Sequence, residues 1–87
     1  MTDDIMRRRT WRTELLRRLY FRAGGGVAAF FPGFELGEEL GMDRAEARKV
    51  LEYLEEKGWV RVDDFRGGMV RLTAEGVDRV EAGEEAE

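Results

Sequence analysis

Among the side chains of this sequence, arginine has the clearest capacity for binding chemistry. The chain has no histidine and no cysteine, which excludes imidazole bases, thiolate nucleophiles, disulfides and ordinary zinc or iron sites. The carboxylate pairs Glu38–Glu39 and Asp63–Asp64 are adjacent in sequence and point in different directions, with no base beside them. We therefore assign no catalytic residue and expect no enzyme activity, cofactor or metal. Anion binding by arginine is the chemistry that remains.

The positive charge is concentrated at the N-terminal end. Residues 1–23 carry seven arginines against three acidic residues, whereas the whole chain of 87 residues has a net charge of -4. Residues 24–57 and 58–87 each have four basic and eight acidic residues. Candidate phosphate contacts are the arginines at the start of the chain: Arg7, Arg8, Arg9 and Arg12. A solvated helix face is the alternative interpretation of such a charge run.

Periodicity predicts the helices that position these residues. A stripe of apolar residues predicts a helix from residue 10 or 11 to 23, with Thr10 as its cap and the glycines at 24–26 as its stop. Residues 27–31 read as a short strand or extended link before a Pro32–Gly33 turn, and residues 34–40 as a brief helix. The stripe has these members: Trp11, Leu15, Leu16, Leu19, Tyr20 and Ala23.

The third helix is the best specified element. Asp43 and Glu46 form an aspartate version of the capping box at its start, and Gly58 ends it. Its core-facing stripe consists of Ala47, Val50, Leu51 and Leu54. This leaves Ala45, Lys49, Glu52 and Glu56 near the centre of the outer face, with Arg44 and Arg48 together on one flank.

After Gly58 the apolar period changes to two, which predicts a hairpin of residues 60–63 and 69–72. Parity requires Val62 to face Leu72 or Val70; we choose Leu72, which would place Asp63 opposite Arg71 and leave a tip of residues 65–69. Thr73 should cap a last helix that ends near Ala82 and packs through Val77 and Val80.

Two stretches resemble a known superfamily. ELGEELGMDRAEARKVLEYLEEKGWVRV and the later VRLTAEGVDRVEA resemble the winged-helix DNA-binding domains, especially the MarR-like and PadR-like bacterial regulators. The resemblance covers residues 34–82 and implies an α+β winged helix-turn-helix fold: a three-helix core, a two-stranded β-hairpin wing and a short C-terminal helix. It also implies that the helix starting at Asp43 enters the major groove, with Phe65 to Met69 as the tip of the wing.

The predicted organisation has three parts. These are a basic N-terminal arm at 1–9, with disorder as an open alternative, a winged-helix domain at 10–82 and an acidic disordered tail at 83–87. The residues predicted to bind DNA are Arg44, Ala45, Arg48, Lys49 and Arg66. As an alternative, Arg48 would merely pair with Glu52 one turn along a solvated helix. Glu52 and Glu56 depart from the strongly basic recognition helix of many relatives, which lowers the expected affinity.

The resulting hypothesis is a small, non-catalytic transcriptional regulator that binds duplex DNA as a homodimer. Candidate dimer contacts are Met6, Trp11 and Phe21. The alternative is a protein-interaction adaptor with the same fold, whose acidic helical face meets a basic protein partner. We expect a cytoplasmic location without a membrane partner, because the sequence has neither an apolar span nor a signal-peptide pattern.

Overall fold

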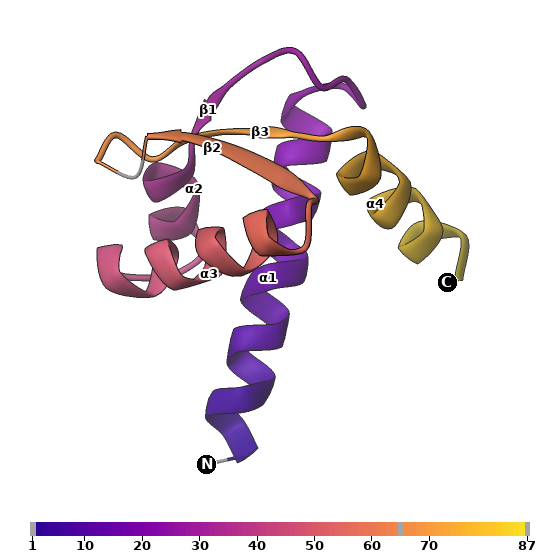
Figure 1. Ribbon diagram of the computed structural model, residues 1–87. Helices are drawn as coiled ribbons and strands as arrows, with labels where there is room; N and C mark the ends of the chain where they lie inside the picture. Colours follow the sequence, from indigo (N-terminus) through magenta and orange to yellow (C-terminus); the bar gives the residue numbers. More distant parts are fainter. Residues whose placement is uncertain (1, 65, 87) are drawn as a thin grey trace.

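The computed structural model describes residues 2–64 and 66–86. Its helices pack against one side of a small antiparallel sheet (Figure 1). Within these residues the fold is α+β, with four helices and three strands. In chain order the elements are α1 (Thr2–Arg22), β1 (Phe31–Pro32), α2 (Gly33–Glu39), α3 (Arg44–Glu56), β2 (Val60–Asp64), β3 (Met69–Leu72) and α4 (Ala74–Ala86).

The sheet has the strand order β1-β3-β2, with both pairs antiparallel. The predicted hairpin exists, but its predicted register is wrong. Val62 pairs with Val70 rather than Leu72, and Arg71 lies opposite Arg61 rather than Asp63. A bulge between Val62 and Asp64 removes Asp63 from the pairing.

The tight β2–β3 turn explains the register. The backbone N–H of Gly68 donates to the carbonyl of Asp64 at 2.6 Å, and Gly68 has a φ of +68° that few other residues adopt. Gly68 therefore closes the turn between Asp64 and Met69, and Met69, which the predicted pairing placed in the tip, belongs to β3. Phe65 lies outside the described residues. The shift of two residues preserves the side-chain parity, so the apolar face is unchanged.

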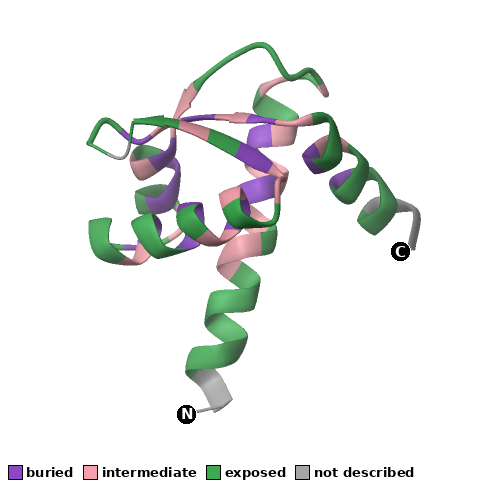
Figure 2. Cartoon of the chain, viewed as in Figure 1, coloured by how far each residue is buried: buried purple, intermediate pink, exposed green. Residues whose placement is uncertain are grey.

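The core lies between α1, α3 and the inner face of the sheet, and Figure 2 shows buried residues on each of these elements. The predicted α3 stripe is buried throughout, and α1 contributes Leu15, Leu16 and Leu19. Other members of the α1 stripe, including Trp11 and Tyr20, are half-buried and pack against this core. Both helical periodicities are therefore confirmed.

The prediction for the start of α1 is wrong, because the helix begins at Thr2 and not at residue 10 or 11. Arginine and methionine are good helix formers, and Asp4 near the N-terminus is favourable for the helix dipole. Thr10 is an interior helical residue, and the segment predicted as an arm continues the helix. Figure 1 shows this N-terminal half extending beyond the other elements.

The first strand is shorter than expected and lies later in the chain. β1 consists of Phe31 and Pro32, and α2 begins at Gly33, where a turn was predicted. Gly33 donates its N–H to the carbonyl of Gly68 at 2.7 Å, so the start of α2 is tied to the β2–β3 turn. Proline is compatible with an edge strand because it has no N–H to donate.

The start of α3 agrees with the prediction in detail. The Asp43 side chain accepts from the Glu46 N–H at 2.8 Å, and the Glu46 carboxylate accepts from the Asp43 N–H at 3.1 Å. Both halves of the capping box are present. Gly41 and Gly58 have positive φ angles of +89° and +79°, which ends α2 and α3 where the sequence indicated.

The last helix is longer than expected. Thr73 Oγ1 accepts from the Gly76 N–H at 3.1 Å, which confirms Thr73 as its cap, and Val80 is buried. The helix continues past the predicted end at Ala82 to Ala86, so residues 83–86 of the predicted tail are helical. Glu87 lies outside the described residues.

Candidate nucleic-acid interface

The outer face of α3 carries the residues predicted to read DNA. Arg44, Ala45, Arg48 and Lys49 are all exposed, because the opposite face of the helix is buried in the core. Their side chains occupy the first two turns of a helix whose N-terminus is fixed by the capping box. These turns are therefore accessible, while their backbone is well anchored.

Arg44 is held in place by two contacts. Its guanidinium lies over the Phe34 ring at 4.3 Å from the centroid, and one of its N–H groups donates to the backbone carbonyl of Arg66. These contacts connect α3 to the β2–β3 turn. Together they shape an open groove of about 450 Å³ lined by Phe34, Arg44, Arg48, Asp64 and Arg66.

Arg48 makes the ion pair that the sequence offered as an alternative. Its Nε lies 3.2 Å from Glu52 Oε1, and the two side chains are 59% and 55% exposed. An exposed pair at this spacing contributes only about 0.3–0.5 kcal/mol. Phosphate oxygens can therefore compete for Arg48 at little energetic cost.

A second groove joins α3 to α1. It has a volume of about 210 Å³ and is lined by Arg8, Trp11, Arg12, Glu46, Lys49 and Val50. The indole N–H of Trp11 donates to the carbonyl of Leu40 at 3.2 Å, which holds α1 against the end of α2. Arg12 stacks on Tyr53, with 3.7 Å from its guanidinium carbon to the ring centroid.

Both grooves are lined in part by α3, with Arg48 in one and Lys49 in the other. We call their six cationic side chains the basic band: Arg8, Arg12, Arg44, Arg48, Lys49 and Arg66. Three acidic residues, Glu46, Glu52 and Asp64, lie within or beside the band. A surface of this kind can bind anions without any covalent step.

The remaining predicted phosphate contacts lie apart from this band. Arg7 is placed over the Trp11 ring, 5.9 Å from its centroid. Arg9 lines a different hollow, between α1 and α4. The four arginines predicted as one group thus divide between two sides of α1, because successive residues on a helix are about 100° apart.

The predicted dimer contacts do not form one patch. Met6 and Phe21 are each 61% exposed, but they are separated by about 22 Å along α1 at 1.5 Å per residue. Trp11 is half-buried within its own chain. Ile5, which the sequence reasoning did not select, is 54% exposed and adjacent to Met6.

The sequence did not indicate two contacts that support arginines of the candidate site. Phe34 is half-buried against the core and supports Arg44, and Tyr53 supports Arg12. In both cases the partners are far apart in sequence, so no local spacing indicates the pair.

No protein-family model matches the chain, and the searches of curated proteins and of solved structures found no significant match.

No helix within residues 2–64 and 66–86 is long and apolar enough to cross a membrane. In the same part of the chain, no group of three or more acidic side chains is arranged to hold a metal ion.

Proposed function

We propose that this chain is a winged-helix protein that binds duplex DNA with α3 and acts without catalysis as a small transcriptional regulator. The order α1-β1-α2-α3-β2-β3 and the strand order β1-β3-β2 support the winged-helix assignment. In this proposal α1, α2 and α3 form the helical core, and the β2–β3 hairpin is the wing. The α2–α3 pair, joined by residues 40–43, is the helix-turn-helix.

The observation that carries the proposal is the basic band. Its cations come from α1, α3 and the β2–β3 turn, which are three separate segments of the chain. A helix in the major groove with phosphate contacts on both sides requires cations in this distribution. Arginine forks at the first turns of α3 suit the acceptor atoms of guanine as well as phosphates.

Salt-dependent binding to a fluorescently labelled duplex of mixed sequence tests the proposal. Non-specific binding should have a dissociation constant of about 10⁻⁴–10⁻⁶ M at physiological salt. If each of the six cations of the basic band neutralises one phosphate, log K should fall against log salt with a slope of about -5. Affinity should then drop by about 10³-fold between roughly 50 and 200 mM salt.

Variants in which glutamine replaces arginine test whether the basic band is the surface that binds the duplex. The double variant Arg44→Gln/Arg48→Gln should reduce the magnitude of the slope by about 2. The control Arg61→Gln removes a charge from an exposed residue of β2 outside the basic band, and its slope should equal that of the wild type. Absence of duplex binding at about 50 mM salt would refute the proposal, as would equal losses in the variant and the control.

Homodimer formation is part of the proposal and depends on the N-terminal half of α1. Ile5 and Met6 are 54% and 61% exposed. They belong to α1, whose N-terminal half extends beyond the other elements (Figure 1). Two-fold pairing through this segment would bury them and place two α3 helices on one duplex. Sedimentation of Ile5→Ser/Met6→Ser should give a monomer where the wild type gives a dimer, and a monomeric wild type would contradict this element of the proposal.

A second candidate function is a protein adaptor, and the acidic outer face favours it. Glu35 and Glu38 on α2 and Glu52 and Glu56 on α3 are all exposed. A basic protein partner would bind this face instead of DNA. Charge reversal at Arg44 and Arg48 discriminates the two: it should abolish duplex binding if the first function holds, and leave capture of a basic partner unchanged if the adaptor function holds.

A further inference from the structure

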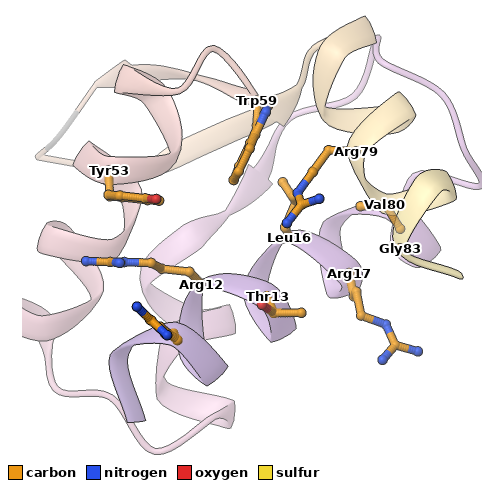
Figure 3. A pocket seen from close by; sticks show the side chains of 10 residues that line it. Arg12, Thr13, Leu16, Arg17, Tyr53, Trp59, Arg79, Val80 and Gly83 are labelled. Carbon is orange, nitrogen blue, oxygen red and sulfur yellow. The ribbon is translucent and has the colours of Figure 1, made fainter. Parts of the chain in front are cut away.

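A third hollow opens between α1, the end of α3 and α4. Its volume is about 380 Å³, within the range of small-molecule sites. Figure 3 shows Tyr53 and Trp59 on one side of it, with side chains of α1 and α4 facing them. We call it the α1–α4 cavity, and it is lined by Arg9, Arg12, Thr13, Leu16, Arg17, Tyr53, Trp59, Arg79, Val80 and Gly83.

The charged side chains among the described residues that line the α1–α4 cavity are all arginines. None of the described residues that line it carries a carboxylate, whereas four are arginines. Arg17 makes an ion pair at 3.8 Å with Glu14, which is not one of the residues that line the cavity. For Arg9, Arg12 and Arg79, no ion pair occurs in the described part of the chain. Three uncompensated cations around one hollow repel one another, and an anion between them would remove that repulsion.

The other walls are aromatic and apolar. Tyr53 and Trp59 meet edge to face, with ring centroids 6.4 Å apart. Arg12 lies over the Tyr53 ring, and Arg79 lies 5.2 Å from the centre of the Trp59 ring. Leu16 and Val80, both buried, close the apolar side. A planar ring is the group that such walls accommodate best.

We propose that the α1–α4 cavity binds a nucleoside phosphate, with its base against Trp59 and its phosphates on Arg9, Arg12 and Arg79. Three unpaired arginines require more negative charge than one carboxylate supplies, and a phosphate chain supplies it. The base satisfies the aromatic walls at the same time. The nucleoside phosphate can be a free nucleotide or the phosphorylated end of a nucleic-acid strand.

This site overlaps the proposed duplex-binding surface at one residue, Arg12. The α1–α4 cavity shares Arg12 with the groove between α1 and α3, and it shares no residue with the groove of Arg44 and Arg66. Arg9 and Arg79 belong to neither groove of the basic band. Variants at these two arginines therefore test the cavity without altering the basic band.

Calorimetric titration of the full chain tests the proposal with adenosine and guanosine 5′-diphosphates. The better of these should bind about tenfold or more tightly than its nucleoside and than inorganic phosphate, because each of those satisfies only one part of the site. A short single strand with a 5′-phosphate, compared with the same strand without it, identifies the source. Tighter binding by the phosphorylated strand than by the diphosphate assigns the site to strand ends, and weaker binding assigns it to free nucleotides.

Three variants locate the binding. Arg79→Gln on α4 and Arg9→Gln on α1 each remove one charged contact from opposite walls and should weaken nucleotide binding about tenfold. The matched control Arg61→Gln should bind as the wild type does, and circular dichroism verifies that each variant is folded. The proposal is overturned if neither diphosphate binds, if inorganic phosphate binds equally well, or if Arg61→Gln loses as much affinity as the other two. Duplex binding should be unchanged in Arg79→Gln, so failure of this proposal and failure of the DNA-binding proposal are separately observable.

Discussion

Replacement of Glu52 by glutamine should strengthen duplex binding. Glu52 lies on the outer face of α3 and accepts from Arg48 Nε at 3.2 Å. DNA binding through Arg48 must break or rearrange this pair before the guanidinium is available to phosphate. Glu52→Gln preserves the size and helix propensity of the side chain but removes the charge that holds Arg48.

The size of the effect follows from the exposure of the pair. Both side chains are more than half exposed, so the pair is screened and contributes about 0.3–0.5 kcal/mol. Its release corresponds to about a twofold gain in affinity, since 1.4 kcal/mol corresponds to tenfold. The gain should be largest at low salt, where the freed charge interacts most strongly with phosphate.

Glu56→Gln is the matched control, because Glu56 lies one helical turn further along the same face. Glu56→Gln removes the same charge from α3 but leaves the ion pair between Arg48 and Glu52 in place. Fluorescence anisotropy with one duplex, at two salt concentrations, should show a larger gain for Glu52→Gln. Equal gains in the two variants would mean that net charge alone is responsible, and no gain in either would refute the involvement of Arg48.

Four further variants test the scaffold through thermal denaturation. Asp43→Ala removes the capping box of α3 and should cost about 1 kcal/mol, which lowers Tm by about 4–8 °C in a domain of this size; an unchanged Tm would contradict the role of the cap. Gly76→Ala places a Cβ against the carbonyl of Trp59 and should lower the free energy of unfolding by about 1–3 kcal/mol. Gly83→Ala in the same helix is the control: its Cβ meets open space, so the free energy of unfolding should be unchanged or higher. Trp11→Phe removes the hydrogen bond to Leu40 and should cost about 1 kcal/mol, and a Tm equal to that of the wild type would show that this bond contributes nothing.

Local signals explain why α3 could be predicted almost completely. The Asp43–Glu46 capping box depends on residues three apart, and the buried stripe depends on the helical period. Gly58 ends the helix through its own backbone conformation. Each of these features is determined within a few residues, so the sequence alone contains the information.

Non-local contacts explain the errors. Nothing in the spacing of β2 and β3 distinguishes Val62 opposite Leu72 from Val62 opposite Val70, because both preserve the apolar face. The register depends on the turn that Gly68 closes. The candidate site was subject to the same limit: arginines could be selected by type, but their division between the basic band and the α1–α4 cavity depends on how α1 packs.

The internal contacts of the arginines decide how much each can contribute to binding. Arg44 uses one N–H for the carbonyl of Arg66 and rests on the Phe34 ring, and a guanidinium has five N–H donors. Its remaining donors are therefore available, and its orientation is already fixed, which reduces the entropy lost when a phosphate binds. Arg48 has a carboxylate partner that neutralises its charge. Arg44 is thus preorganised for an anion while Arg48 is held by a competitor. For this reason the position of an arginine on the fold, more than the net charge of the chain, determines how readily that arginine can accept an anion.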